Sequence, residues 1–225
     1  MGLKEPGLRG SLRNVSVGIA AIPDAVVDDF ERGNLDPYTL HDAGNYNPSV
    51  TDSSPVLEGD KSLQASGSDG VVSTLDSTSG LDNYPSVGDL FGFLTRFDNL
   101  DARSYQFFGV QDESTRLDGE YWIVHRADLS EMQLRKDGNT LDSVSVNYTV
   151  DQSYDTHVDW VSQDEILVKL YEGLTDELDS ENEIATLTVT NISDGYTSGG
   201  IGWGFGSAGS TVDIRHDYCR ILKSD

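Results

Sequence analysis

The stretch THVDWVSQDEILVKLYEG, residues 156–173, carries the pattern that decides the fold. Apolar and polar residues alternate in the first run, 156–162, and a short polar turn separates it from a second, largely apolar run at 165–173. Alternation with a period of two is typical of strands that bury one face. We therefore expect two consecutive strands here, the second ending in an acidic-glycine hairpin at 172–173.

Short segments of the same kind recur along most of the chain, with turn signals roughly every 8–12 residues between them. The remaining predicted strands are 61–66, 70–75, 89–97, 104–112, 120–128, 131–137, 144–150, 184–192, 200–207 and 210–222. The dipeptide Asp137-Gly138 within RKDGNT predicts a tight hairpin turn. No long helix and no internal repeat stands out. The pattern predicts an all-β, two-sheet antiparallel sandwich.

The charge of the chain indicates its environment. The 225 residues contain 39 Asp and Glu against 15 Lys and Arg, which gives a formal net charge of -24. Such a surface holds hydrated cations and is costly at low salt, where self-repulsion is unscreened. We interpret it as adaptation to molar salt, and an ordinary acidic surface is the alternative. Nucleic acid is not expected as a partner, because little here would neutralise phosphates.

Cysteine content and hydropathy argue against a disulfide-stabilised domain and against a membrane protein. The single cysteine, Cys219, excludes an internal disulfide framework and lies in an apolar run, which favours a packed thiol. No apolar stretch reaches the length of a membrane span, so no membrane partner is expected.

Three stretches resemble known jelly rolls. THVDWVSQDEILVKLYEG and GGIGWGFGSAGSTVDIRHDYCRIL (199–222) resemble the central and closing strands of laminin-G-like, concanavalin-A-like domains. DDFERGNLDPY (28–38) with VLEGDKSLQAS (56–66) resembles the opening of jelly-roll carbohydrate-binding modules. The resemblance covers about residues 28–222. It implies a jelly-roll sandwich over 28–225, preceded by an extended arm over 1–27.

The arm contains GLRGSLRNVSVGIAAIPD, residues 7–24, which is basic and glycine-containing on an otherwise acidic chain. Together with the following DDFE, it resembles the lead segment of virion proteins of tailed viruses of halophilic archaea. This resemblance implies a capsid decoration or vertex turret protein, with a tail protein as the weaker alternative. Such a particle is assembled in the host cytoplasm. We expect the arm to bind other virion proteins and to support a homo-oligomer, whereas a floppy terminus is the alternative. The expected anchoring residues are Leu8, Arg9, Leu12, Arg13, Val15 and Ile19.

The carbohydrate-binding jelly rolls also imply a structural Ca²⁺. The matching carboxylates are Glu31, Glu58 and Asp217, with Asp29 nearby and the backbone carbonyl of Lys61 as a further oxygen. Carboxylate and carbonyl oxygens are the ligands that Ca²⁺ prefers. The alternative is that these acids are simply part of a very acidic surface.

Aromatic residues are the candidates for ligand contact, because sugars stack on aromatic rings. Tyr84, in the loop YPSVGD, and Trp122 are the predicted contacts, and host glycans or an S-layer are the predicted partners. Trp160, Trp203, Tyr105 and Tyr148 are further possibilities, with core packing as the alternative for the two tryptophans. A lectin-like carbohydrate-binding module outside any virion remains the second reading of the whole chain.

Catalysis is not expected. The segment ELDSE, residues 177–181, superficially matches the Glu-x-Asp-x-Glu motif of retaining glycosidases of this fold. It lies among other acids after a strand end, which favours a solvated acidic turn. A glycosidase that uses Glu177, Asp179 and Glu181 is therefore only a third possibility.

Overall fold

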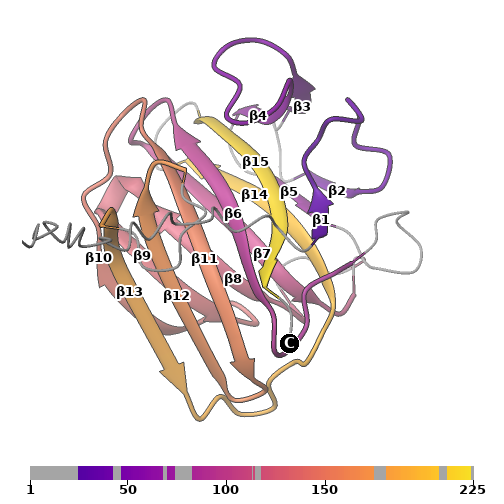
Figure 1. Ribbon diagram of the computed structural model, residues 1–225. Helices are drawn as coiled ribbons and strands as arrows, with labels where there is room; N and C mark the ends of the chain where they lie inside the picture. The colour runs from indigo at the N-terminus through magenta and orange to yellow at the C-terminus, as the bar shows by residue number, and fades with distance from the viewer. Residues whose placement is uncertain are drawn as a thin grey trace, which may run out of the picture.

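The computed structural model describes residues 25–42, 47–67, 70–73, 83–112, 114, 118–174, 181–207 and 212–223. These residues form two antiparallel sheets packed face to face (Figure 1), which confirms the predicted fold class. The eight-stranded sheet runs in the order β13 (Glu183–Thr190), β12 (Glu165–Glu172), β11 (Ser153–Ser162), β6 (Leu90–Phe97), β15 (Val212–Lys223), β4 (Ser62–Gly67) and β3 (Asn47–Thr51), with β1 (Ala25–Asp28) paired to β15.

The six anchoring residues predicted for the arm lie outside the described residues.

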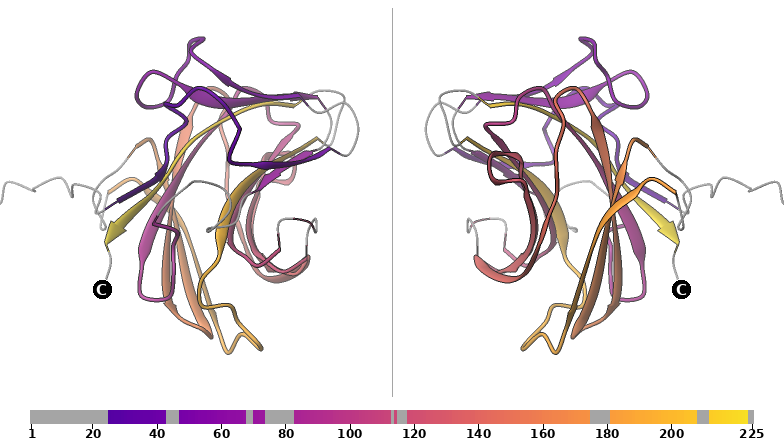
Figure 2. Two further views of the ribbon diagram at one scale, coloured as in Figure 1. Left: turned by 90° about the vertical axis from the view of Figure 1, so that its right-hand side faces the viewer. Right: turned by 90° about the vertical axis from the view of Figure 1, so that its left-hand side faces the viewer.

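The second sheet has seven strands. Its order is β10 (Asn139–Ser145), β9 (Glu131–Lys136), β8 (Tyr121–Arg126), β7 (Ala102–Val110), β14 (Gly200–Ser207), β5 (Gly70–Ser73) and β2 (Thr39–Asp42). Only a short 3₁₀ turn, η1 (Ala127–Leu129), interrupts the strands between β8 and β9. Figure 2 shows both ends of this sheet curving away from the eight-stranded sheet, so that its outer face is concave.

The inner faces of the two sheets share one aromatic core. Phe93 of β6 lies 6.0 Å, centroid to centroid, from Trp203 of β14, and Phe108 of β7 lies 5.3 Å from Trp160 of β11. All four side chains are fully or almost fully buried. Burying a large apolar side chain is worth roughly 2–3 kcal/mol, so contacts of this kind hold the sheets together. Trp160 and Trp203 are thus core residues, and Cys219 is buried as predicted.

A buried polar network crosses this core. Thr95 Oγ1 accepts the Gln106 amide at 2.8 Å and lies 2.9 Å from His216 Nδ1. His125 bridges Gln106 Oε1 at 3.2 Å and the Tyr148 hydroxyl at 3.0 Å. Burial lowers the pKa of both histidines to about 3. Both rings are therefore neutral at neutral pH, and each nitrogen can serve as donor or acceptor without a charge.

Most predicted strands are found, but one is misplaced. The hairpin turn at Asp137-Gly138 has positive φ at both residues, 49° and 77°, as a two-residue hairpin turn of this kind requires. It sends the chain directly into β10 at Asn139, so residues 139–145 are the strand and the predicted 144–150 is wrong. Val146 and Tyr148, which suggested that strand, are instead buried in the core beyond its end.

None of the helices in the described ranges is long and apolar enough to cross a membrane.

Candidate functional site

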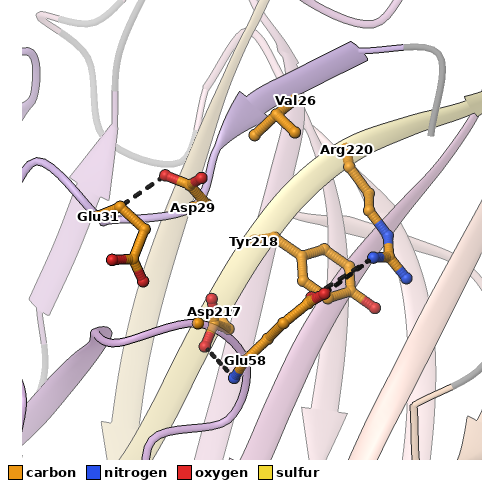
Figure 3. Close-up of a pocket in the computed structure, with 8 residues that line it drawn as sticks. Val26, Asp29, Glu31, Glu58, Asp217, Tyr218 and Arg220 are labelled. Carbon is orange, nitrogen blue, oxygen red and sulfur yellow. Dashed lines mark hydrogen bonds and ion pairs between the residues drawn. The ribbon is translucent and has the colours of Figure 1, made fainter. Parts of the chain in front are cut away.

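Four of the five residues predicted to bind calcium line one cavity. Asp29 and Glu31 follow β1, Glu58 precedes β4, and Asp217 lies on β15 (Figure 3). The cavity has a volume of about 240 Å³. Its lining consists of Val26, Asp29, Glu31, Glu58, Gly59, Asp217, Tyr218 and Arg220. Residues far apart in the sequence therefore come together as the resemblance implies.

An irregularity in β15 places Asp217 in this cavity. The pairing of β15 with β6 shifts register between His216 and Cys219, so two residues fall between side chains that both point into the core. Such a bulge turns the intervening residues away from the regular alternation. Asp217 and Tyr218 thereby line the cavity rather than the core between the sheets.

The loop before β4 fixes the Glu31 carboxylate. Glu31 Oε1 accepts backbone N–H groups of Asp60 at 2.7 Å and Lys61 at 2.9 Å. Gly59 has a φ of +64°, and a Cβ there would lie 2.4 Å from Glu31 Oε1. Only glycine allows the turn to approach this carboxylate so closely.

Asp217 is a buried acid of the cavity. It is 1% exposed and accepts the Glu58 backbone N–H at 2.9 Å. Burial, reinforced by the negative charges of Glu58 and Glu31, raises the pKa of Asp217 to about 8. A buried carboxylate beside other carboxylates is costly in its charged form unless a cation is present.

Arg220 supplies part of that positive charge. Its Nη1 lies 3.4 Å from both carboxylate oxygens of Glu58, and its guanidinium lies 3.9 Å from the centroid of the Tyr218 ring. Figure 3 shows Glu58 and Arg220 reaching toward each other across Tyr218, with Asp29 and Glu31 on the other side of the cavity.

The donor set suits Ca²⁺, which prefers carboxylate oxygens. Asp29, Glu31, Glu58 and Asp217 would hold the ion, whose charge would offset the repulsion around Asp217. Lys61, whose backbone carbonyl is the fifth predicted ligand, is not among the residues that line the cavity, and its ammonium group donates to the Glu31 backbone carbonyl at 2.7 Å. Among the described residues, no three metal-binding side chains are clustered closely enough to form a ready-made site. The cavity thus has suitable ligands, and calcium remains a prediction.

The aromatic residues predicted to contact a ligand lie elsewhere. Tyr84 is half-buried and packs against the main core. Trp122 of β8 is 4% exposed and packs with Phe107, Val110 and Val124 on the outer side of the seven-stranded sheet. The half-exposed aromatic ring beside this cluster is Tyr105, 6.1 Å from Trp122 between ring centroids.

The outer face of β7, β8, β9 and β14, here called the concave face, has a regular layout. Its outward positions follow from alternation with core residues such as Ile123, Leu134 and Trp203. Strand pairing gives three rows across β7, β8 and β9: Arg103–Arg126–Glu131, Tyr105–Val124–Gln133 and Phe107–Trp122–Arg135.

Glycines give β14 a different surface. The sequence GIGWGFGS alternates glycine with core residues, so the outward side of β14 carries no side chains over Gly200–Gly206. A Cβ at Gly204 would lie 2.9 Å from Phe107 and 3.0 Å from Tyr105. The missing side chains allow these two rings to lie against the backbone of β14.

No protein-family model matches the sequence, and no curated protein matches it in sequence. Solved structures match it in fold. A glycoside hydrolase family 16 endo-glucanase from Bacteroides ovatus is 10% identical, with a TM-score of 0.54 over 86% of this chain and 98% of that one. The β-glucanase of Bacillus licheniformis is 13% identical, with a TM-score of 0.53 over 88% and 98%. A protein of unknown function with a galectin-like fold from Bacillus subtilis is 11% identical, with a TM-score of 0.52 over 82% and 88%. At these identities the likeness shows the fold alone: this chain is a jelly-roll sandwich of the concanavalin-A and galectin type.

Proposed function

We propose that the protein is a non-catalytic structural component on the surface of a halophilic archaeal virus particle, a capsid decoration or vertex turret, and that it contacts host glycans. The concave face is the observation that carries the glycan contact. It combines a buried aromatic floor, the half-exposed ring of Tyr105, and long polar side chains on three adjacent strands. Aromatic rings for stacking and side chains for hydrogen bonds are what sugar recognition requires.

The carboxylates on this face support binding rather than hydrolysis. Glycosidases use two carboxylates, about 5–5.5 Å or about 6.5–9.5 Å apart. On the four described strands of the concave face, Glu131 is the one outward carboxylate, and it accepts the Gln133 amide at 2.7 Å. Asp128, on η1, is paired with Arg103 and Arg126. Both carboxylates are therefore engaged by neighbouring side chains, and they do not form the pair of available carboxylates that a glycosidase needs.

One acid of the sequence motif 177–181 lies in the described part of the chain. Glu177 and Asp179 lie outside the described residues. Glu181 is exposed just before β13, at the edge of the eight-stranded sheet rather than on the concave one, which favours a solvated position for this carboxylate.

The virion setting rests on the arm and the charge. Weak glycan contacts become effective when many copies engage at once, which an ordered particle surface provides. Molar salt screens long-range attraction, so short-range packing at Tyr105 should dominate adhesion.

Replacing Tyr105 with Ala tests the glycan contact. We expect the wild-type protein to be retained on immobilised cell-surface glycan from a halophilic archaeon in molar KCl. Tyr105→Ala should lose about five- to thirtyfold in affinity, because one stacking ring contributes on the order of 1–2 kcal/mol. The matched control is Tyr196→Ala, which removes a partly buried tyrosine that packs against the main core and should leave retention unchanged.

Two results would overturn this function. Equal retention of wild type and Tyr105→Ala would remove the concave face as the binding surface. Release of new reducing ends from the glycan by the wild type would make the protein an enzyme.

A further inference from the structure

Arginines are concentrated on the concave face. The chain has 15 Lys and Arg against 39 Asp and Glu, yet Arg103, Arg126 and Arg135 lie on the outward side of three neighbouring strands. Arg103 and Arg126 are direct cross-strand partners. Like charges placed opposite each other destabilise a sheet. Their presence on so acidic a chain requires a compensating contact.

One carboxylate serves two of these arginines. Asp128 Oδ2 accepts Arg103 Nε at 3.1 Å and Nη2 at 2.9 Å, and Arg126 Nη2 at 3.3 Å. Arg126 Nε is buried without a hydrogen-bond partner. Glu131, the register partner of Arg126 on β9, adds a second carboxylate, so the excess of positive charge on this face comes from the third arginine, Arg135.

Arg135 is less well compensated. In the described part of the chain, its one side-chain hydrogen bond runs from Nε to Gln133 Oε1 at 2.8 Å, and it forms no ion pair. Partial burial lowers the pKa of Arg135, and the positive charges of Arg126 and Arg103 lower it further, against the opposing effects of Tyr105 and Glu131. None of the described residues accepts a hydrogen bond from the outer nitrogens of this guanidinium, so a bound ligand can do so.

The neighbour of Arg135 across the strands is also a donor. Trp122 is its register partner on β8, and the indole Nε1 is buried without a hydrogen-bond partner. Guanidinium and indole N–H groups only donate hydrogen bonds. The indole nitrogen is itself inaccessible to a ligand, so the donors at this end of the concave face that a ligand can reach are those of the partly exposed Arg135, and their positive charge favours an anion.

We propose that the concave face recognises an acidic glycan, whose carboxylate or sulfate accepts hydrogen bonds from Arg135. Tyr105, in the adjacent row, stacks on the sugar ring that carries the acid. This inference rests on the proposed glycan-binding function and adds the chemical class of the ligand. Arginine presents paired donors that match the two oxygens of a carboxylate or sulfate, and charge-assisted hydrogen bonds of this kind are the strong ones.

Three hexasaccharides with one β-1,4-linked backbone test the proposal by calorimetry on the full chain in molar KCl. They are cellohexaose, which is neutral, the corresponding hexaglucuronate and sulfated cellohexaose. We expect at least one acidic ligand to bind about tenfold or more tightly than cellohexaose, which corresponds to roughly one charge-assisted hydrogen bond. The two acidic ligands distinguish a carboxylate from a sulfate.

Variants assign the effect to Arg135. Arg135→Gln should remove the preference for the acidic ligand, and Arg135→Lys, which keeps the charge but not the paired donors, should retain part of it. The control is Lys169→Gln, which removes one positive charge from the eight-stranded sheet and should leave the preference unchanged.

The possible results separate the two proposals. Equal affinity for neutral and acidic ligands, lost in Tyr105→Ala, would overturn the acidic ligand and leave glycan binding intact. An acid preference that survives in Arg135→Gln would also overturn the role of Arg135. No binding of any of the three ligands would contradict both proposals.

Discussion

When the pH falls from 6.5 to 5, the free energy of unfolding of the wild-type protein should decrease by about 2 kcal/mol more than that of a His125→Gln variant. Burial lowers the pKa of His125 from its ordinary value of 6.5 to about 3. In this pH range the unfolded chain binds a proton at His125 that the folded chain does not. The contribution of the neutral His125 ring to the free energy of unfolding is therefore fully present above pH 6.5. It is lost progressively as the pH falls from 6.5 to the folded pKa of about 3.

Glutamine is the suitable replacement because it does not titrate and its amide can keep part of the network with Gln106 and Tyr148. Urea unfolding of both proteins in molar KCl at the two pH values gives the difference. Thr140→Gln, which introduces glutamine at an exposed position of β10 and removes no titrating group, is the control and should show the pH dependence of the wild type. Parallel pH dependence of wild type and His125→Gln would contradict a neutral buried ring.

His216, which has the same low pKa in the same network, should give a second loss of similar size.

At pH 9, with divalent cations removed, Asp217→Asn should be several kcal/mol more stable than the wild type. The pKa of Asp217 is raised from 3.8 to about 8 by burial and by the charges of Glu58 and Glu31. Between pH 3.8 and pH 8 the folded state binds a proton that the unfolded state has released, and at pH 9 the folded state carries the buried charge. Stability from this group is complete below pH 3.8 and is lost as the pH rises through 8. Asparagine cannot ionise, and its oxygen can still accept the Glu58 N–H.

Calcium should stabilise the wild type but not the Asp217→Asn variant. The ion binds the charged carboxylate, so millimolar Ca²⁺ at pH 9 should raise the melting temperature of the wild type and leave that of Asp217→Asn unchanged. The control is Asp213→Asn, which removes another acid of β15 that does not line the cavity. An equal effect of Ca²⁺ on wild type and Asp217→Asn would show that the cavity is not a calcium site. A wild type that is as stable as Asp217→Asn at pH 9 without calcium would contradict the raised pKa.

The sequence predicts those strands best in which one face is buried and the other is not. GIGWGFGS alternates glycine with large apolar residues, and the predicted strand 200–207 coincides with β14. The short strands β1, β2 and β3 escaped prediction, because each is too short to show a clear period and is held by a neighbouring strand. β10 was misplaced because Val146 and Tyr148 are buried without belonging to a strand.

The two candidate sites differ in how far the sequence could reveal them. The acids of the cavity were predicted from segments that resemble carbohydrate-binding modules, although they lie as far apart as residues 29 and 217. The concave face had no such signal. In YWIVHR the residues of both faces are buried, so the pattern could not tell whether Trp122 points inward or outward. Arg103, Arg126 and Arg135 become neighbours only through strand pairing, which composition does not reveal.

The central claim, that the chain is built into a particle surface, is tested most directly by its mass in solution. Light scattering in molar KCl compares the full chain with a chain that lacks residues 1–24, a deletion that stops before β1 begins at Ala25. The account predicts a closed oligomer for the full chain and a folded monomer for the shortened chain, with unchanged binding at the concave face. Two folded monomers, both retained on glycan, would contradict the assembly role and favour a free lectin-like module.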